Sequence, residues 1–591
     1  MTVNRETSQR TAGEVIADHL IEEGVPYVCG IPGHGDMGIF DALKERESKL
    51  RTIQVRHEQS AGHIADAYYR VSGIPLATVT SIGPGSVNLA MALATAYVDS
   101  QAVISITGGV QTYMEGTGVL QEIERQRDAD FPSVLRPVTK RSFSVHRSDQ
   151  MQRVMHRAFN VALSGRPGPV HIDVPIDLQS HWGDPAPMDA GVHRATHKTI
   201  QPDPDAIDQI AAILASAKRP VILAGGGCIQ SGAAQALFKL ATQLQIPVVT
   251  TMMGKSVFPE DHPLSAEHTG SNGTICGNHF TSTADVLLAV GTRFAEQTSS
   301  SYVDGMSFRI PGCQLLHVDI DEREIGKNYP VTVGVVGDAR SSLEAISAAM
   351  GDPKSTSSER ESYLGEIAEW RERWLSAIQS RWSPDVLSMS RALAVLRDVL
   401  PREAIVIASA GYPQIKMFQE FQTYEPRTWL TSGGYSTMGF TVPAALGAKL
   451  ARPDVPVVGV AGDGDFLMTI QELALAVQEN IPVVYLVLNN SGWVSIRDFQ
   501  NGMFGEGREF GVDFRTRDGE LVTPDFTLVA KGFGCHSEKV LTLDELAPAI
   551  ERALASGGPA VVEAIIDRTF EFTGGVDSGH WDLPAPDYLI H

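Results

Sequence analysis

Cysteine, basic charge and long hydrophobic runs are all scarce in this chain of 591 residues. Its five cysteines lie far apart without CxxC spacing, which argues against a disulfide framework or a zinc site and indicates a reducing compartment. The net charge of -22 argues against nucleic-acid and anionic-membrane partners, because these need a basic surface. No apolar run approaches the roughly eighteen residues of a membrane span, and the polar start lacks a signal peptide's apolar core. We therefore expect a cytoplasmic protein whose partners are small molecules.

Short apolar runs rich in β-branched residues alternate with amphipathic helical stretches along the whole chain. This alternation is typical of α/β folds with parallel sheets covered by helices, and the length suffices for about three domains. We predict doubly wound domains at residues 1–182, 203–346 and 384–570, with a Pro-rich linker at about 181–203 and an irregular tail at 571–591. Buried strands are expected at 76–82, 102–109, 168–175, 219–227, 246–254, 284–294, 313–321, 404–411, 455–465, 481–490 and 558–567.

Two polar turns near the end of the chain are separated by one helix and one strand. The run "VPVVGVAGDGD" predicts a strand and a tight turn, a single helix is expected from about Phe466, and "IPVVYLVLNN" predicts a parallel strand. Asp463 and Asn490 would then lie at the carboxyl ends of strands, where open α/β sheets bind ligands. The free N–H groups of the helix would suit a phosphate, and carboxylate and amide oxygens suit Mg²⁺. Taken singly, each feature is an ordinary turn or strand end.

Taken together, the two turns resemble the diphosphate-binding motif of thiamin diphosphate enzymes. The resemblance implies that the side chains of Asp463 and Asn490 and the backbone carbonyl of Gly492 hold Mg²⁺. It also places Gly462, Gly464, Asp465 and Trp493 beside the cofactor. Asp465 stands where many relatives carry Ser or Ala, which leaves its own role open.

The chemistry of this cofactor needs a carboxylate elsewhere in the chain. The aminopyrimidine of the cofactor itself abstracts a ring proton, and a carboxylate hydrogen-bonded to it promotes the form that acts as base. The segment "TIQVRHEQSAGHIADAYYRVSG" supplies Glu58 after a strand and resembles the acetolactate synthase branch of the family. An isolated Glu in this position would be an ordinary helix start.

Further matches to the family extend over about residues 12–570. They imply that the cofactor is also contacted by Gly83, Asn88, Tyr412, Gln414, Ser436 and Met438, with the bulky Met438 bending it into a V shape. They imply a pyrimidine-binding, a middle and a diphosphate-binding domain. In that family the cofactor lies between the first domain of one chain and the third of another, so we expect at least a homodimer, and a homotetramer is common.

The type of reaction is predicted from four local features. His34 stands where acetolactate synthases have a small residue; it would bind a substrate oxygen or shuttle a proton, unless it is only a polar surface residue. Gln121 matches the active-site Gln of the family and can both donate and accept hydrogen bonds. Segments 289–301 and 489–526 look more like the thiamin diphosphate-dependent trihydroxycyclohexanedione hydrolase of inositol breakdown.

These features favour cleavage of a C–C bond next to a ketone in a polar, cyclic 1,2-dione or polyol-derived substrate. Acetolactate synthase-like carboligation of 2-oxo acids is the first alternative. A catalytically silent homologue that serves as a scaffold is the second, and the presence of Glu58, Asp463 and Asn490 argues against it.

Two further features leave alternatives open. In the middle domain, the glycines at 225–227, "GTRF" and "HVDIDEREIGKN" resemble the FAD-binding segments of acetolactate synthases, although other relatives leave this site empty or bind ADP there. In the tail, His580 and Trp581 would form a lid over the pocket, or belong to a packed terminal segment.

Overall fold

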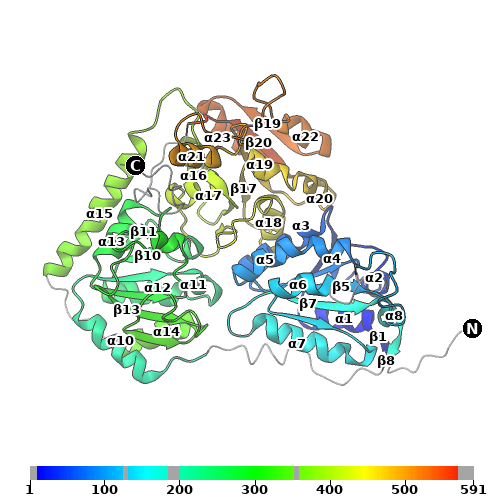
Figure 1. Ribbon diagram of the computed structural model, residues 1–591. Coiled ribbons are helices and arrows are strands. Elements are labelled where there is room, and N and C mark those ends of the chain that lie inside the picture. The colour runs from blue at the N-terminus through cyan, green and yellow to red at the C-terminus, as the bar shows by residue number, and fades with distance from the viewer. Residues whose placement is uncertain (1–8, 124–130, 184–199, 352–357, 570–591) are drawn as a thin grey trace, which may run out of the picture.

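The computed structural model describes residues 9–123, 131–183, 200–351 and 358–569, and it contains three six-stranded sheets. All strand pairs within these sheets are parallel, and helices flank each sheet, as the sequence predicts. Figure 1 shows the three domains as separate lobes, coloured blue to cyan, green, and yellow to red in chain order. The predicted linker falls largely outside the described residues, and the tail with His580 and Trp581 falls wholly outside them.

The first sheet has the strand order β3-β2-β4-β5-β7-β6. Its strands are β2 (Tyr27–Ile31), β3 (Arg51–Gln54), β4 (Ala77–Thr80), β5 (Ile104–Gly109), β6 (Arg141–Ser144) and β7 (Val170–Pro175). Around it lie α1 (Ala12–Glu22), α2 (Met37–Lys44), α3 (Glu58–Ser72), α4 (Pro84–Asn88), α5 (Ala90–Val98), α6 (Phe131–Leu135), α7 (Met151–Leu163) and α8 (Ile176–Ser180). A short antiparallel pair, β1 (Arg10–Thr11) with β8 (Trp182–Gly183), joins the two ends of the domain.

The third sheet repeats this order as β16-β15-β17-β18-β20-β19. Its strands are β15 (Ile405–Ile407), β16 (Trp429–Leu430), β17 (Val457–Gly462), β18 (Val484–Asn489), β19 (His536–Val540) and β20 (Ala560–Ile565). The helices are α16 (Met389–Val399), α17 (Gly411–Glu420), α18 (Thr441–Ala451), α19 (Asp463–Leu467), α20 (Leu473–Gln478), α21 (Val494–Phe504), α22 (Phe526–Phe533) and α23 (Leu543–Ala555). Helices α3 and α18 approach closely, since a Cβ on Gly447 would meet the Ile64 carbonyl oxygen at 2.3 Å.

The middle sheet has a different order, β11-β10-β9-β12-β13-β14. Its strands are β9 (Pro220–Ala224), β10 (Val248–Thr250), β11 (Ser265–His268), β12 (Val286–Val290), β13 (Gln314–Asp319) and β14 (Val333–Val336). Its helices are α10 (Pro204–Ser216), α11 (Gly226–Gln230), α12 (Ala234–Leu244), α13 (Ile275–Thr283) and α14 (Ala339–Met350). This is the strand order of dinucleotide-binding folds, whose ligands bind where the order reverses, here between β9 and β12.

The sequence analysis missed one helix and misjudged another. Helix α15 (Ser358–Gln379) connects the middle and third domains along one side of the molecule (Figure 1), and it buries Tyr363, Ile367 and Trp374. The single helix predicted from Phe466 is wrong, because the chain forms α19, a 3₁₀ turn at Ile470–Glu472 and then α20. Thr469 interrupts the helix with φ -136° and ψ 21°, and its hydroxyl donates to the Gly439 carbonyl at 3.0 Å.

None of the helices within the described ranges combines the length and the apolar character that crossing a bilayer requires.

Candidate active site

Glu58 is the first residue of α3, directly after the loop that follows β3. The Asn88 side-chain amide donates to Glu58 Oε2 at 2.9 Å, and a Cβ on Gly85 would lie 3.2 Å from Oε1. The structure thus brings together two predicted residues, one at the start of the helix after β3 and one at the end of the helix after β4. The absence of a side chain at Gly85 leaves space beside the carboxylate.

Gln121 lies against Gly83, another predicted residue of the same loop cluster. Gly83 has φ +66°, and a Cβ there would meet the Gln121 carbonyl oxygen at 2.3 Å, so this position requires glycine. Gln121 Oε1 is buried and has no hydrogen-bond partner among the described residues. A buried acceptor without a partner is unusual in proteins and is available to a ligand.

His34 is exposed on the loop after β2, and the buried Asp36 follows it. The loop is fixed because Gly35 N–H donates to Ser81 Oγ at 2.9 Å and Gly33 N–H donates to Asp36 Oδ1 at 2.7 Å. Asp36 Oδ2 has no partner in the described part of the chain, and burial raises the pKa of Asp36 to about 7. The sequence analysis did not single out Asp36; an acidic residue among glycines and apolar residues was the available signal.

The third domain contributes the predicted metal motif. Asp463 is 2% exposed, and its two oxygens accept hydrogen bonds from Gly464 N–H at 2.8 Å and Gly492 N–H at 3.1 Å. Burial raises the pKa of Asp463, and these N–H groups oppose the rise. The turns after β17 and β18 are therefore tied together, with a carboxylate at their junction.

The two adjacent asparagines of this motif have separate surroundings. The Asn489 amide donates to Thr523 Oγ1 at 2.9 Å and to Glu563 Oε1 at 2.8 Å, so it is a structural residue within the domain. Asn490 is only partly buried and is not engaged in this way. The hard oxygens of Asp463 and Asn490 fit a magnesium ion, which accepts few protein ligands.

Trp493 covers the glycine turn after β17. A Cβ on Gly464 would meet its indole ring at 2.1 Å, so Gly464 is needed for this contact. Gly462 is more open, since its Cβ would find only Pro413 at 3.8 Å.

Asp465 does not face an open site. It is buried, Oδ1 accepts from Gly439 N–H at 2.6 Å, and Oδ2 accepts from Thr441 Oγ1 at 2.7 Å. Both oxygens are thus engaged within the domain, and the side chain holds the turn that carries Met438. The contact of Asp465 with the cofactor stays a prediction. Met438 itself is 38% exposed.

The other predicted residues of the third domain form four hydrogen bonds in two separate groups. Gln414 donates to Ser409 O and to Thr431 Oγ1, both at 2.6 Å, and Ser436 Oγ donates to Gln414 Oε1 at 3.4 Å. Tyr412 donates its hydroxyl to Asp498 Oδ2 at 2.9 Å, which ties α17 to α21.

Within one chain, no hydrogen bond between described residues joins the two halves of this site. Glu58 bonds with Asn88 in the first domain, and Asp463 bonds with Gly464 and Gly492 in the third. The two domains touch elsewhere, through α3 with α18 and through Glu472 of the third domain, which accepts from Arg56 N–H.

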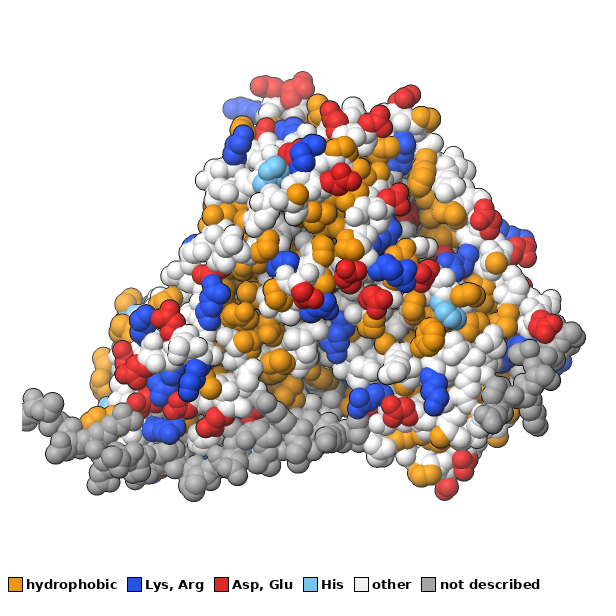
Figure 2. Space-filling view, turned by 180° about the vertical axis from the view of Figure 1, so that it is seen from behind, with side chains coloured by type: hydrophobic (Ala, Val, Ile, Leu, Met, Phe, Trp, Pro, Cys, Tyr) orange, Lys and Arg blue, Asp and Glu red, His pale blue; other side chains and the backbone are white. Residues whose placement is uncertain are grey.

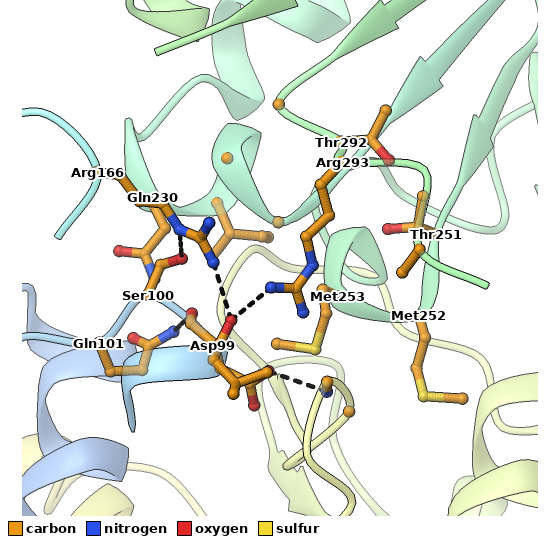
Figure 3. A pocket seen from close by; sticks show the side chains of 18 of the residues that line it. Asp99, Ser100, Gln101, Arg166, Gln230, Thr251, Met252, Met253, Thr292 and Arg293 are labelled. Atoms are coloured by element: carbon orange, nitrogen blue, oxygen red, sulfur yellow. Dashed lines mark hydrogen bonds between the residues drawn. The ribbon is translucent and has the colours of Figure 1, made fainter. Parts of the chain in front are cut away.

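A separate cavity of about 590 Å³ lies where all three domains meet (Figure 3). Figure 3 shows Arg166 and Arg293 reaching toward the segment around Asp99 from opposite sides. Both guanidiniums donate to the Val98 carbonyl, at 3.1 Å and 2.6 Å, and Gly434 N–H donates to Asp99 Oδ1 at 2.9 Å. The cavity is thus rimmed by two arginines, one from the first and one from the middle domain, that share the Val98 carbonyl of the first domain.

The middle domain supplies the cavity with the turns after β9 and β12. A Cβ on Gly225 would meet the Gly291 carbonyl oxygen at 2.2 Å, so the two turns pack backbone to backbone. Asp319, at the end of β13, and Asp338, after β14, also line the cavity, and burial raises the pKa of Asp319 to about 6. This is the crevice where the strand order of the sheet reverses.

Comparisons with known proteins agree with this geometry. Residues 10–129, 207–346 and 409–564 match the N-terminal TPP binding domain, the central domain and the C-terminal TPP binding domain of thiamine pyrophosphate enzymes. The chain is 36% identical to a probable acetolactate synthase large subunit of Methanocaldococcus jannaschii, over 94% of this chain and 91% of that protein. It is 34% identical to the acetolactate synthase large subunit of Corynebacterium glutamicum, over 96% and 89%. Acetolactate synthase 1 of Zea mays is 33% identical, over 97% and 88%. The chain therefore belongs to the thiamine pyrophosphate enzymes, and thiamin diphosphate is its cofactor.

Proposed function

We propose that this enzyme joins 2-oxo acids by acetolactate synthase-like carboligation, with thiamin diphosphate and Mg²⁺. From the sequence alone, C–C cleavage ranked first and carboligation second. We now rank carboligation first. The supporting observation is similarity over nearly the whole chain to proteins named acetolactate synthase, combined with Glu58, Asp463 and Asn490 in matching loops. The particular closeness to the trihydroxycyclohexanedione hydrolase is not shown by the relatives described above, which are named acetolactate synthases.

Each half of the site has a distinct task in this proposal. Asp463, Asn490 and the Gly492 carbonyl hold Mg²⁺ and, through it, the diphosphate. When bound, thiamin diphosphate supplies a nucleophilic ring carbon and an electron sink. Glu58 holds a proton at the aminopyrimidine, and Asn88 fixes the carboxylate for that purpose.

Substrate recognition falls to His34 and Gln121 in this proposal. The unpartnered Oε1 of Gln121 and the exposed imidazole of His34 lie in loops at the same edge of the first sheet as Glu58. They would hydrogen-bond the oxygens of a 2-oxo acid. An exposed His on this loop also keeps cleavage of a polar ketone as the second candidate, because His can move a proton near neutral pH.

The functional unit that we propose is a homodimer, in which Glu58 of one chain and Asp463 of the other form one site. Hydrophobic side chains exposed beside the two halves support it, among them Met91, Tyr113 and Leu120 in the first domain and Tyr435 and Met468 in the third. Tyr113 and Leu120 are 74% and 70% exposed. Exposed apolar patches of this kind mark interfaces. Figure 2 shows one face of the molecule, on which several groups of hydrophobic side chains are separated by charged ones. A homotetramer would pair two such dimers, and light scattering distinguishes the two assemblies.

The three-domain cavity is proposed to bind FAD. Its glycine turn after β9 suits the phosphates of a dinucleotide. The carboxylates of Asp319 and Asp338 suit the ribose hydroxyls. The residues that line the cavity include Gly226 of the middle domain and Ser436 of the third domain, in the turn that carries Met438. A lining that reaches this turn favours a ligand longer than ADP. Because all five cysteines are buried and unpaired, we also propose a reducing, cytoplasmic location.

Incubation of the pure enzyme with thiamin diphosphate, Mg²⁺ and pyruvate tests the proposed reaction. The parallel panel contains cyclic diones and ketoses, and products are followed by mass. Acetolactate from pyruvate supports carboligation, whereas cleaved diones without pyruvate turnover would support the second candidate.

A further inference from the structure

Glu472 is a buried carboxylate that neither half of the site uses. It is 0% exposed and ends the 3₁₀ turn at Ile470–Glu472, between α19 and α20. The turn exists because Thr469 interrupts the helix and bonds to Gly439 instead. The chain therefore departs from helical geometry just before Glu472, the residue that contacts the first domain.

The partner of Glu472 is the backbone just before Glu58. Arg56 N–H donates to both carboxylate oxygens, at 3.0 Å to Oε1 and 3.2 Å to Oε2. Arg56 follows β3 and stands two residues before α3, whose N-cap is His57. A carboxylate at this point satisfies a donor before the helix and interacts favourably with the helix dipole.

The charged groups around Glu472 do not replace this contact. The Arg56 guanidinium is directed to the Gln54 carbonyl and to Gln478, so it forms no hydrogen bond with Glu472. Cys29 of β2 and Tyr485 of β18 interact electrostatically with Glu472, and burial keeps both protonated by raising their pKa values. Burial likewise raises the pKa of Glu472 to about 7, against the lowering effect of neighbouring donors that include the Arg56 N–H.

We propose that Glu472 is a positioning residue: from the third domain, it fixes the start of α3 and thereby the direction of the Glu58 carboxylate. This inference rests on the proposed role of Glu58. In the dimer it has a further consequence, because the segment that carries Asp463 for one site also orients Glu58 for the other.

The test measures hydrogen–deuterium exchange at the reactive ring carbon of bound thiamin diphosphate, in holoenzyme saturated with cofactor and Mg²⁺. Glu472→Gln keeps the side-chain volume and one acceptor, and Glu472→Asp withdraws the carboxylate by one methylene. We expect each to slow the exchange by about 10- to 100-fold, since small misplacements of a reacting group have effects of this size. The dissociation constant of thiamin diphosphate and the KM for pyruvate should change by less than about threefold, and kcat should fall with the exchange rate.

Glu479→Gln is the matched control. Glu479 also reaches from the third domain to the first, where it pairs with the Arg51 side chain rather than with the backbone before Glu58. Its exchange rate should equal that of the wild type. The variant Glu58→Gln distinguishes the role of Glu58 from the positioning role of Glu472. An unchanged exchange rate in Glu58→Gln would overturn the proposed role of Glu58. Exchange lost in Glu58→Gln but normal in both Glu472 variants would overturn the positioning role.

Discussion

Asp463 Oδ2 accepts a hydrogen bond from Gly492 N–H at 3.1 Å, which joins the turn after β17 to the turn after β18. Replacing Asp463 or Asn490 by Ala removes one of the proposed magnesium ligands. We expect each change to weaken thiamin diphosphate binding by about 100-fold in the presence of Mg²⁺, since loss of a charge-assisted ligand is worth roughly 2–3 kcal/mol. Calorimetric titration with and without Mg²⁺ measures the dissociation constant of thiamin diphosphate.

The neighbouring Asn489 provides the control for this prediction. Because its amide is bonded to Thr523 and Glu563, Asn489→Ala should lower the free energy of unfolding by about 1–3 kcal/mol and leave cofactor affinity unchanged. Loss of cofactor affinity in Asn489→Ala, with normal affinity in Asn490→Ala, would mean that the metal ligand has been assigned to the wrong asparagine.

The composition of the site from two chains predicts complementation. Glu58→Gln and Asp463→Ala should each be nearly inactive alone, with kcat reduced by about 10²- to 10⁴-fold. In the mixed dimer, Glu58 of one chain and Asp463 of the other restore one intact site. Random pairing of co-expressed chains should recover about one quarter of the wild-type activity. A mixture as inactive as its components would place both residues in a site within one chain.

Asp36 predicts a pH dependence of stability. Its pKa is about 7 in the folded chain against 3.8 ordinarily, so the folded state binds more protons than the unfolded state between these values. The stability that Asp36 contributes is complete below about pH 4 and is lost as the pH rises through 7. Relative to Asp36→Asn, the wild type should lose on the order of 4 kcal/mol between pH 4 and pH 7, of which about 3 kcal/mol falls above pH 5. Urea unfolding at pH 5 and pH 8 measures the difference, and an equal gap between the two proteins at both values would contradict it.

If the three-domain cavity binds FAD, the affinity for FAD should depend on Arg293, which lines it. Arg293→Ala should reduce the FAD content of purified protein and raise its dissociation constant about tenfold, because a cation at the cavity is lost. Arg323→Ala is the control, since Arg323 is an exposed arginine of the same domain that pairs with Asp321. Flavin absorption gives the readout. Equal loss in both variants, or a colourless wild type that binds only ADP, would contradict the proposal.

Most inner strands could be predicted from sequence and most edge strands could not; the inner strand β2 was missed, and the edge strand β3 was expected before Glu58. Runs such as those of β17 and β18 are continuous and β-branched because both faces are buried, whereas β16 has only two residues, Trp429–Leu430. The break at Thr469 was beyond prediction, since a contact with Gly439 in another turn produces it. Local propensity along the segment favoured one continuous helix.

The site was predictable to the extent that its residues follow strands. Asp463 and Asn490 come directly after strands and Glu58 follows β3 after a short loop, so all three could be assigned to the ligand-binding edges of two sheets. The functions of Asp36 and Glu472 depend on burial and on partners distant in the sequence, which no local pattern encodes.

The proposed carboligation is tested most directly by the product that the purified enzyme forms from pyruvate with thiamin diphosphate and Mg²⁺, analysed by mass. Carboligation predicts acetolactate, formed in proportion to enzyme and abolished by Glu58→Gln. Absence of pyruvate turnover, with cleavage of a cyclic dione by the same preparation, would contradict it.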